Sequence, residues 1–210
     1  MNNKLIAKSF LWMAIGLLVT FVTGFFASTS YNIMDALFVN KLYIPLAIIE
    51  IVLVIVLSAF IYKMSPTIAK VSFLFYSFIS GLAFSSIFIV FSVKYIVYVF
   101  LVAAFLFGLF GFIGYVTKIN LNKIGTILLM VLIGAIILSL LNAFVLHNAL
   151  DIPMCILFLV IFLGITAWDM QKLKNMDEYS DNAAIYGALQ LYLDFINILI
   201  SLLRLFKRND

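Results

Sequence analysis

The sequence predicts an all-α integral membrane protein, a seven-transmembrane-helix bundle forming a single multi-pass membrane domain over residues 1–210. Composition is the first observation behind this prediction. Of the 210 residues, 66% are hydrophobic and 10% are charged, and the mean hydropathy is +1.25. Soluble domains have about 45–50% apolar and about 25% charged residues. The composition therefore excludes soluble enzymes, nucleic-acid-binding modules, disulfide-rich secreted domains and disordered proteins.

Seven apolar runs, the second observation, have the length that a bilayer requires. A spanning helix needs roughly 20 mostly apolar residues, and the runs lack the alternating pattern of β-barrel strands. The first run continues to about Ala27, which is too long for the apolar core of a cleaved signal peptide, roughly 7–15 residues. We predict helices near 8–28, 44–62, 71–92, 95–117, 125–146, 153–169 and 184–206.

Small residues recur at spacings of three and four within several of these runs. They are Gly16, Thr20 and Gly24 in the first, Ser77, Gly81 and Ser85 in the third, and Ala104, Gly108 and Gly111 in the fourth. In lipid, small side chains allow helix backbones to approach closely. We expect these positions to be packing contacts between helices rather than ligand sites.

Orientation is predicted from the lysines and arginines between the runs. One set of alternate connections carries eight lysines: Lys4, Lys8, Lys63, Lys70, Lys118, Lys123, Lys172 and Lys174. The opposite set carries only Lys41 and Lys94. The positive-inside rule therefore predicts a cytoplasmic N-terminus, and the expected location is the cell (inner) membrane. Arg204, Lys207 and Arg208 follow the core of the seventh run, whose length permits a crossing, whereas the charge rule favours re-entry.

Three acidic residues lie at or near membrane depth: Glu50, Asp169 and Asp194. A carboxylate at the bilayer centre costs at least about 2.5–3.5 kcal/mol, so such residues face a polar interior or carry a proton. Glu50 has a plain alternative, a neutral acid hydrogen-bonded between two helices. For Asp194 the sequence around it favours a polar interior.

Asp194 belongs to a polar stripe on the seventh run. Its members follow one another at spacings of three and four and are Gly187, Gln190, Asp194, Asn197 and Ser201, with Arg204 three residues further. This spacing places them on one helical face. An apolar helix with such a stripe is expected inside a bundle, facing a polar or wet pathway.

Two aspartates at this depth suggest three chemistries. If Asp169 and Asp194 lie about 4 Å apart at an effective dielectric near 20, they repel by about 4 kcal/mol, which favours sharing a proton. Ionised carboxylates are also ligands for Ca²⁺. The third chemistry is intramembrane aspartyl proteolysis, but the Gly-x-Gly-Asp motif of such proteases is absent, because Tyr192 and Leu193 precede Asp194.

The same residues resemble the Bax inhibitor-1 (transmembrane Bax inhibitor motif) family, in particular its bacterial YccA- and YetJ-like members. The strongest similarity is in 187–198, GALQLYLDFINI, and in 164–174, GITAWDMQKLK. Weaker similarity lies in 64–66, 80–87 and 114–118. The resemblance implies a fold in which the last helix is central and surrounded by the other six.

The resemblance also implies a pH-sensitive calcium leak in which two aspartates sense protons and Ca²⁺. These positions are Asp169 and Asp194, and the family's acidic residue in the second helix is Glu50. YetJ-like members have a latch arginine near the end of that helix, where this chain has Ile61 and Tyr62, so Lys63 is the nearest cation. The YccA-like branch implies an alternative, modulation of a membrane-bound quality-control protease.

We therefore expect a pH-gated calcium (cation) channel or transporter rather than an enzyme, with Asp169 and Asp194 as sensor and candidate Ca²⁺ ligands. The interior polar residues are Glu50, Gln190, Asn197, Ser201 and Arg204, and Lys63 is a possible latch cation. The expected partners are the lipid bilayer, protons and Ca²⁺ as a permeant or regulatory ion, with no cofactor and no nucleic acid. The alternative is a non-conducting binding protein that acts on a membrane-bound protease.

Overall fold

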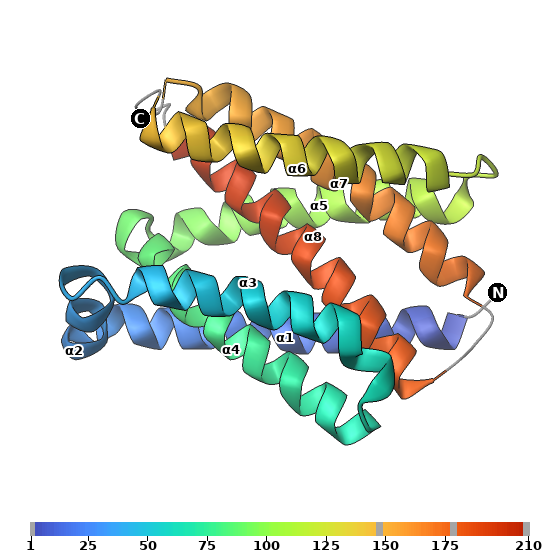
Figure 1. Ribbon diagram of the computed structural model, residues 1–210, viewed down its shortest axis with the longest axis horizontal. Coiled ribbons are helices and arrows are strands. Elements are labelled where there is room, and N and C mark those ends of the chain that lie inside the picture. Colours follow the sequence, from blue (N-terminus) through green and yellow to red (C-terminus); the bar gives the residue numbers. More distant parts are fainter. Residues whose placement is uncertain (1–2, 146–148, 177–179, 208–210) are drawn as a thin grey trace. The chain divides into compact units, whose positions relative to one another are not determined.

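The computed structural model describes residues 3–145, 149–176 and 180–207, and these form helices without any strand. Seven of the described helices are long and apolar enough to cross a membrane, which confirms the predicted fold class. They are α1 (Asn3–Thr29), α3 (Tyr43–Phe60), α4 (Pro66–Val90), α5 (Val93–Val116), α6 (Asn122–Phe144), α7 (Asp151–Asn175) and α8 (Asp181–Lys207), shown in Figure 1. A 3₁₀ turn, η2 (Ile61–Lys63), extends α3.

The connection between the first two spans contains structure that the hydropathy pattern does not predict. A short helix, α2 (Tyr31–Met34), is followed by one turn of π-helix, η1 (Asp35–Val39). The Asn40 side chain donates a hydrogen bond to Asp35 Oδ2 (3.3 Å). Lys41 has a positive φ of 57°, a left-handed conformation of the kind that commonly ends a helix.

Three helices, α1, α4 and α7, extend well beyond the ends predicted from hydropathy, and α1 begins at Asn3 instead of 8. α4 begins at Pro66 instead of 71, because Ser65 caps it by accepting a hydrogen bond from the Ile68 N–H (3.4 Å) and proline fits the first helical turn. α7 continues to Asn175 instead of ending at 169. Its last turns are polar and are held by hydrogen bonds to the α5–α6 connection, so hydropathy alone ends the helix too early.

The described chain divides into two compact units. The first unit contains α5 from Val97, α6, α7 and the part of α8 from Leu193. The second unit contains α1 to α4, the start of α5 and the part of α8 up to Tyr192. The prediction of one domain with α8 surrounded by the other six helices stays a prediction.

In the second unit, α1 and α4 pack through the predicted small residues. A Cβ atom on Gly81 would lie 2.8 Å from the Thr20 carbonyl oxygen, and one on Gly24 would lie 3.0 Å from the Gly81 carbonyl oxygen. The Thr20 hydroxyl donates to the Ser77 carbonyl oxygen (2.9 Å). The expectation of close backbone packing is confirmed for α1 and α4. It is not met at the glycines of α5, because among the described residues a Cβ atom on Gly108 would have no neighbour within 4 Å, and one on Gly111 would lie 3.9 Å from the Met170 methyl carbon.

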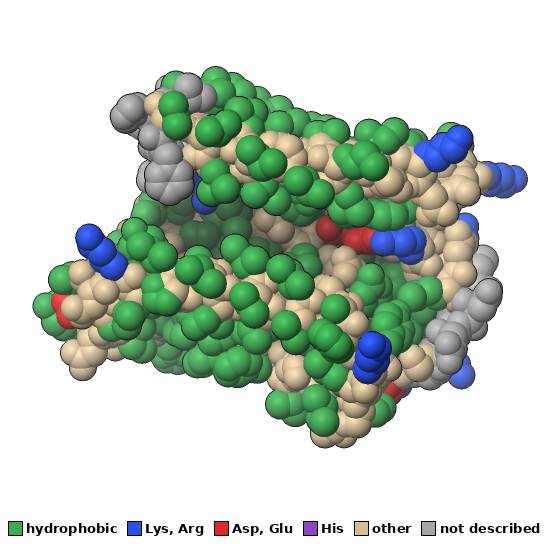
Figure 2. Space-filling model, viewed as in Figure 1, with side chains coloured by type: hydrophobic (Ala, Val, Ile, Leu, Met, Phe, Trp, Pro, Cys, Tyr) green, Lys and Arg blue, Asp and Glu red, His purple; other side chains and the backbone are tan. Residues whose placement is uncertain are grey.

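α8 differs from the other spans in how much of it is buried. In its most apolar window 61% of residues are buried, compared with 11–39% in the other six spans of the described chain. By contrast, the surfaces of α3 and α6 visible in Figure 2 are covered by hydrophobic side chains, with lysine or arginine near the helix ends. This pattern is typical of helices that face lipid.

α8 is also one continuous helix of 27 residues. At 1.5 Å per residue it is roughly 40 Å long, enough to cross the hydrocarbon core of a bilayer. The helix contains no break at which the chain could re-enter, so Arg204 lies at the opposite end from Asp181. This favours the crossing alternative for the seventh span; Arg208 lies outside the described residues.

Candidate functional site: a buried aspartate pair

The first unit brings Asp169 and Asp194 together. Asp169 lies on α7 and Asp194 on α8, and each side chain is almost entirely buried, with 3% of its residue surface exposed. The two carboxyl groups are close enough to interact electrostatically. Two acids from different helices are therefore buried within reach of each other's charge, and their role as a sensor stays a prediction.

Asp194 is incompletely hydrogen-bonded. Its Oδ2 is buried and has no hydrogen-bond partner in the part of the chain that the structure describes. The carboxyl is hydrogen-bonded to the Thr166 hydroxyl, and that hydroxyl donates its single hydrogen to the Phe162 carbonyl oxygen (2.7 Å). Asp194 is thus a buried acid with one oxygen that lacks a hydrogen-bond partner in the described chain.

Asp169 has a cationic partner on its own helix. The Lys172 Nζ lies 2.7 Å from Asp169 Oδ1, and the Lys172 side chain is 37% exposed. Lys172 also acts electrostatically on Asp194. The prediction from sequence missed this lysine, although residues three apart on a helix are neighbours and opposite charges at that spacing pair. The pair of acids is therefore a triad with one cation.

The end of α7 that carries this triad is fixed to the α5–α6 connection. Gln171 accepts from the Leu121 N–H and donates to the Ile119 carbonyl oxygen, both at 2.8 Å. Lys174 donates to the Tyr115 carbonyl oxygen (2.7 Å). These bonds satisfy backbone groups in the connection and hold the last turns of α7 in helical form next to Asp169.

The remaining members of the polar stripe are not gathered at the pair. Asn197 donates to the Leu193 carbonyl oxygen (2.8 Å) and Ser201 donates to the Asn197 carbonyl oxygen (2.7 Å), so both bond to the backbone of α8 itself. Arg204 is exposed, and Gln190 is half-buried in the second unit. The stripe is helical as predicted, but its use as a pathway lining stays a prediction.

Glu50 lies in the second unit, where its carboxyl is half-buried and hydrogen-bonded to Ser80. The Tyr192 ring is within the same cluster: it packs edge-on against Tyr76 at 5.8 Å between ring centroids. Its hydroxyl contacts Thr20 at 2.6 Å, and because Thr20 already donates to Ser77, Tyr192 is the donor. The bond between Glu50 on α3 and Ser80 on α4 resembles the plain alternative for Glu50, an acid hydrogen-bonded between two helices.

Lys63 is exposed at the end of the same unit, and its Nζ lies 5.4 Å from the centre of the Phe60 ring. The suggestion that Lys63 acts as a latch stays a prediction.

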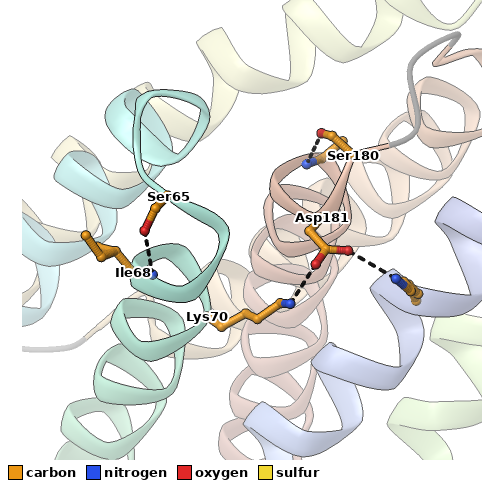
Figure 3. A network of polar contacts seen from close by, with 7 residues as sticks. Ser65, Ile68, Lys70, Ser180 and Asp181 are labelled. Atoms are coloured by element: carbon orange, nitrogen blue, oxygen red, sulfur yellow. Dashed lines mark hydrogen bonds and ion pairs between the residues drawn. The ribbon is translucent and has the colours of Figure 1, made fainter.

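A second polar cluster, which sequence reasoning missed, lies at the start of α8 in the second unit (Figure 3). The Asp181 carboxylate accepts from Lys70 Nζ at 2.7 Å and from Lys8 Nζ at 3.0 Å. Next to it, Asn182 donates to the carbonyl oxygens of Ile61 (2.8 Å) and Met64 (2.7 Å). This α8 anchor, Asp181 with Asn182, joins α1, η2 and α4, whose partners are 111 or more residues away in sequence.

The donor set of the aspartate pair suits a hard cation. It offers two carboxylates and the Thr166 hydroxyl, which are oxygen ligands, whereas Ca²⁺ takes six to eight oxygens. Within residues 3–145, 149–176 and 180–207, no group of three or more His, Cys, Asp or Glu side chains gathers. A bound cation would therefore need water to complete its shell.

Comparison with known proteins places this architecture among membrane proteins. Residues 2–210 match the family model described as "Inhibitor of apoptosis-promoting Bax1". The chain is 41% identical over 209 residues to the inner membrane protein YbhL of Escherichia coli K12, covering 95% of this chain and 89% of YbhL. It is 37% identical to a Borreliella burgdorferi protein, covering 100% and 94%, and 35% identical to a Deinococcus radiodurans protein, covering 97% and 90%.

Proposed function

The chain belongs to the Bax inhibitor-1 family, and from that membership together with the aspartate pair we propose a pH-sensitive leak of Ca²⁺ across the membrane. The chain is a multi-pass membrane protein with seven apolar spans. The observation that carries the proposal is Asp194, a buried acid with one oxygen lacking a hydrogen-bond partner in the described chain and a second acid beside it.

Proton binding by the pair supplies the pH dependence in this proposal. Two carboxylates about 4 Å apart at an effective dielectric near 20 repel by about 4 kcal/mol, so a buried pair holds a shared proton more readily than two separate acids. Acidic conditions should keep the pair protonated and the leak closed, and flux should rise as the proton is lost.

Calcium binding by the deprotonated pair supplies the second half of the proposal. Once the proton leaves, Asp169 and Asp194 are two negative charges in a buried setting, and a divalent cation compensates both. Lys172 already compensates part of this negative charge through its contact with Asp169. The incoming ion therefore competes with both a proton and an ammonium group for the same oxygens.

Reconstituted protein tests this function. Purified protein in liposomes loaded with a Ca²⁺ indicator should give flux that rises with pH, and Asp194→Asn should flatten the profile because an amide cannot titrate. Asp151→Asn is a matched control: that aspartate accepts a hydrogen bond from Asn142 (2.8 Å) far along α7 from the pair, and an amide oxygen still accepts. A wild-type pH profile in Asp194→Asn would overturn the sensor assignment.

The proposed location is the inner membrane, with the N-terminus in the cytoplasm. The positive-inside count supports this orientation, and the name of YbhL supports the membrane. Lys8, Lys70 and Asp181 meet, as required if the starts of α1, α4 and α8 lie on one membrane face. Reporter domains inserted after Asn120 and after Asn40 should report cytoplasmic and external locations respectively; the opposite result would reverse the orientation.

The alternative is a non-conducting binding protein that modulates a membrane-bound quality-control protease. It predicts a stoichiometric protease partner in preparations from native membranes and no Ca²⁺ flux in liposomes. A catalytic role, which we do not propose, would instead give turnover of a transmembrane peptide that is lost in both Asp169→Asn and Asp194→Asn.

A further inference from the structure

Trp168 precedes Asp169 on α7, and the face of its ring contacts the ammonium group of Lys172. This contact surface is called the Lys172 seat, or simply the seat. The Lys172 Nζ lies 3.7 Å from the centre of the Trp168 ring, while the same nitrogen lies 2.7 Å from Asp169 Oδ1. An ammonium over an indole face is attracted by the negative π-surface. The ring and the carboxylate thus hold one ammonium between them.

The indole itself is held by the first turn of α6. Its Nε1–H donates to Asn122 Oδ1 (3.0 Å). Its ring also packs against Gly125, one helical turn later, where a Cβ atom would collide with the ring. Two separate contacts with α6 therefore fix the ring on which Lys172 rests.

We propose that Trp168 is a positioning residue that holds Lys172 on the aspartate pair, so that a divalent cation must displace this ammonium to bind. The inference rests on the proposed function, because it assumes that the pair binds Ca²⁺. Free of the ring, a lysine at a part-exposed position would spend most of its time extended into water, and its competition with the incoming cation would weaken.

Other lysines of this unit are either bonded elsewhere or exposed. Lys174 on α7 donates to the Tyr115 carbonyl oxygen at the end of α5, and its Nζ lies 5.3 Å from the Tyr115 ring centre. Lys118 and Lys123, in and after the α5–α6 connection, are exposed. Lys172 is the ion-pair partner of Asp169 in the described chain, which makes it the cation to test.

Tryptophan fluorescence tests the seat without measuring flux. The chain has two tryptophans, so Trp12→Phe leaves Trp168 as the single emitter. Addition of CaCl₂ to this full-length variant should change the Trp168 emission, since the ammonium leaves the ring. In Trp12→Phe/Lys172→Met the emission should start near the Ca²⁺-loaded value and not respond. A response that is the same without Lys172, or no response at all, would overturn the proposal.

Flux measurements test whether the seat affects cation binding. Lys172→Met and Trp168→Leu should each lower the half-saturating Ca²⁺ concentration about two- to fivefold, the range expected from an exposed cation–π contact. The double variant should equal Lys172→Met alone. If Trp168→Leu still lowers the value in the Lys172→Met background, Trp168 acts by another route and the proposal fails.

Milder variants protect the test against misfolding. Trp168→Phe keeps a ring under the ammonium but loses the N–H, and Asn122→Ala loses the same hydrogen bond from the other side. Each should shift the half-saturating concentration in the same direction as Trp168→Leu and by less; a shift in the opposite direction in either variant contradicts the seat. Absence of flux with an intact fluorescence response would overturn the proposed function alone, and normal flux without that response would overturn the seat alone.

Discussion

Asp181 and Asp194 lie on the same helix, but they differ in exposure and in hydrogen-bond partners. Asp181, in the second unit, is part-exposed, and both of its oxygens accept from lysines on other helices. Asp194, in the first unit, is 3% exposed, has an oxygen without a hydrogen-bond partner in the described chain, and lies beside another acid. Asp181 thus has a partner for each carboxylate oxygen, whereas Asp194 has a buried oxygen without one in the described chain.

The difference separates stability from function within one helix. A fully paired carboxylate at the surface contributes modestly to stability and does not attract a further ligand. A buried acid with an unmet acceptor costs stability, and such groups persist in native proteins where they serve binding or proton transfer. Replacement of each acid should therefore change stability with opposite signs.

The largest effect is expected at Asp194. Asp194→Leu removes a buried, incompletely bonded polar group, and it should raise the free energy of unfolding in detergent by roughly 1–3 kcal/mol while abolishing pH-dependent flux. Thermal unfolding followed by circular dichroism measures the first effect. Asn197→Leu is the matched control on the same helix: its amide already donates to the Leu193 carbonyl oxygen, so no gain is expected. Equal gains in both variants would remove the contrast.

A smaller effect of opposite sign is expected at Asn182 in the α8 anchor. Asn182→Ala removes two hydrogen bonds to the carbonyl oxygens of Ile61 and Met64, and it should lower the free energy of unfolding by about 1–2 kcal/mol. The thermal midpoint relative to Asn32→Ala, an exposed position on α2, measures this loss. An unchanged midpoint would show that the anchor is not needed for the fold.

The smallest effect is expected at Asp181. Its ion pairs are part-exposed, so Asp181→Asn should lower the free energy of unfolding by about 0.5–1 kcal/mol at low ionic strength. At 1 M salt the screening length falls to about 3 Å, and the difference from wild type should shrink toward zero. A salt-independent difference would mean that Asp181 acts through packing rather than charge.

The fold was accessible from the sequence because lipid imposes simple rules. Seven runs of about the bilayer thickness predict seven helices, and the two buried aspartates stand out because few acids lie at membrane depth. Helix ends were less accessible: α7 continues to Asn175 because Gln171 bonds to the α5–α6 connection 50 residues earlier and Lys174 bonds to the end of α5, 59 residues earlier. Hydropathy contains no information about such partners.

The partners of the acids were harder to predict than the acids themselves. The Lys172–Asp169 pair has a local signal, the spacing of three on one helix, and could have been found. The ion pair between Lys8 and Asp181 has none, since it joins residues 173 apart. Asn197 and Ser201 have the expected spacing, but each hydroxyl or amide bonds to the backbone one turn earlier, an option open to any polar residue on a helix.

Because α8 supplies residues to both units, the order of synthesis matters for assembly in the membrane. α8 leaves the ribosome after the other described helices. Lys8 and Lys70 therefore form their ion pairs with Asp181, and Thr20 forms its hydrogen bond with Tyr192, only after α8 has been made. In the first unit, Asp169 meets Asp194 only at the same late stage. Insertion of one helix thus completes two sets of polar contacts in a single event.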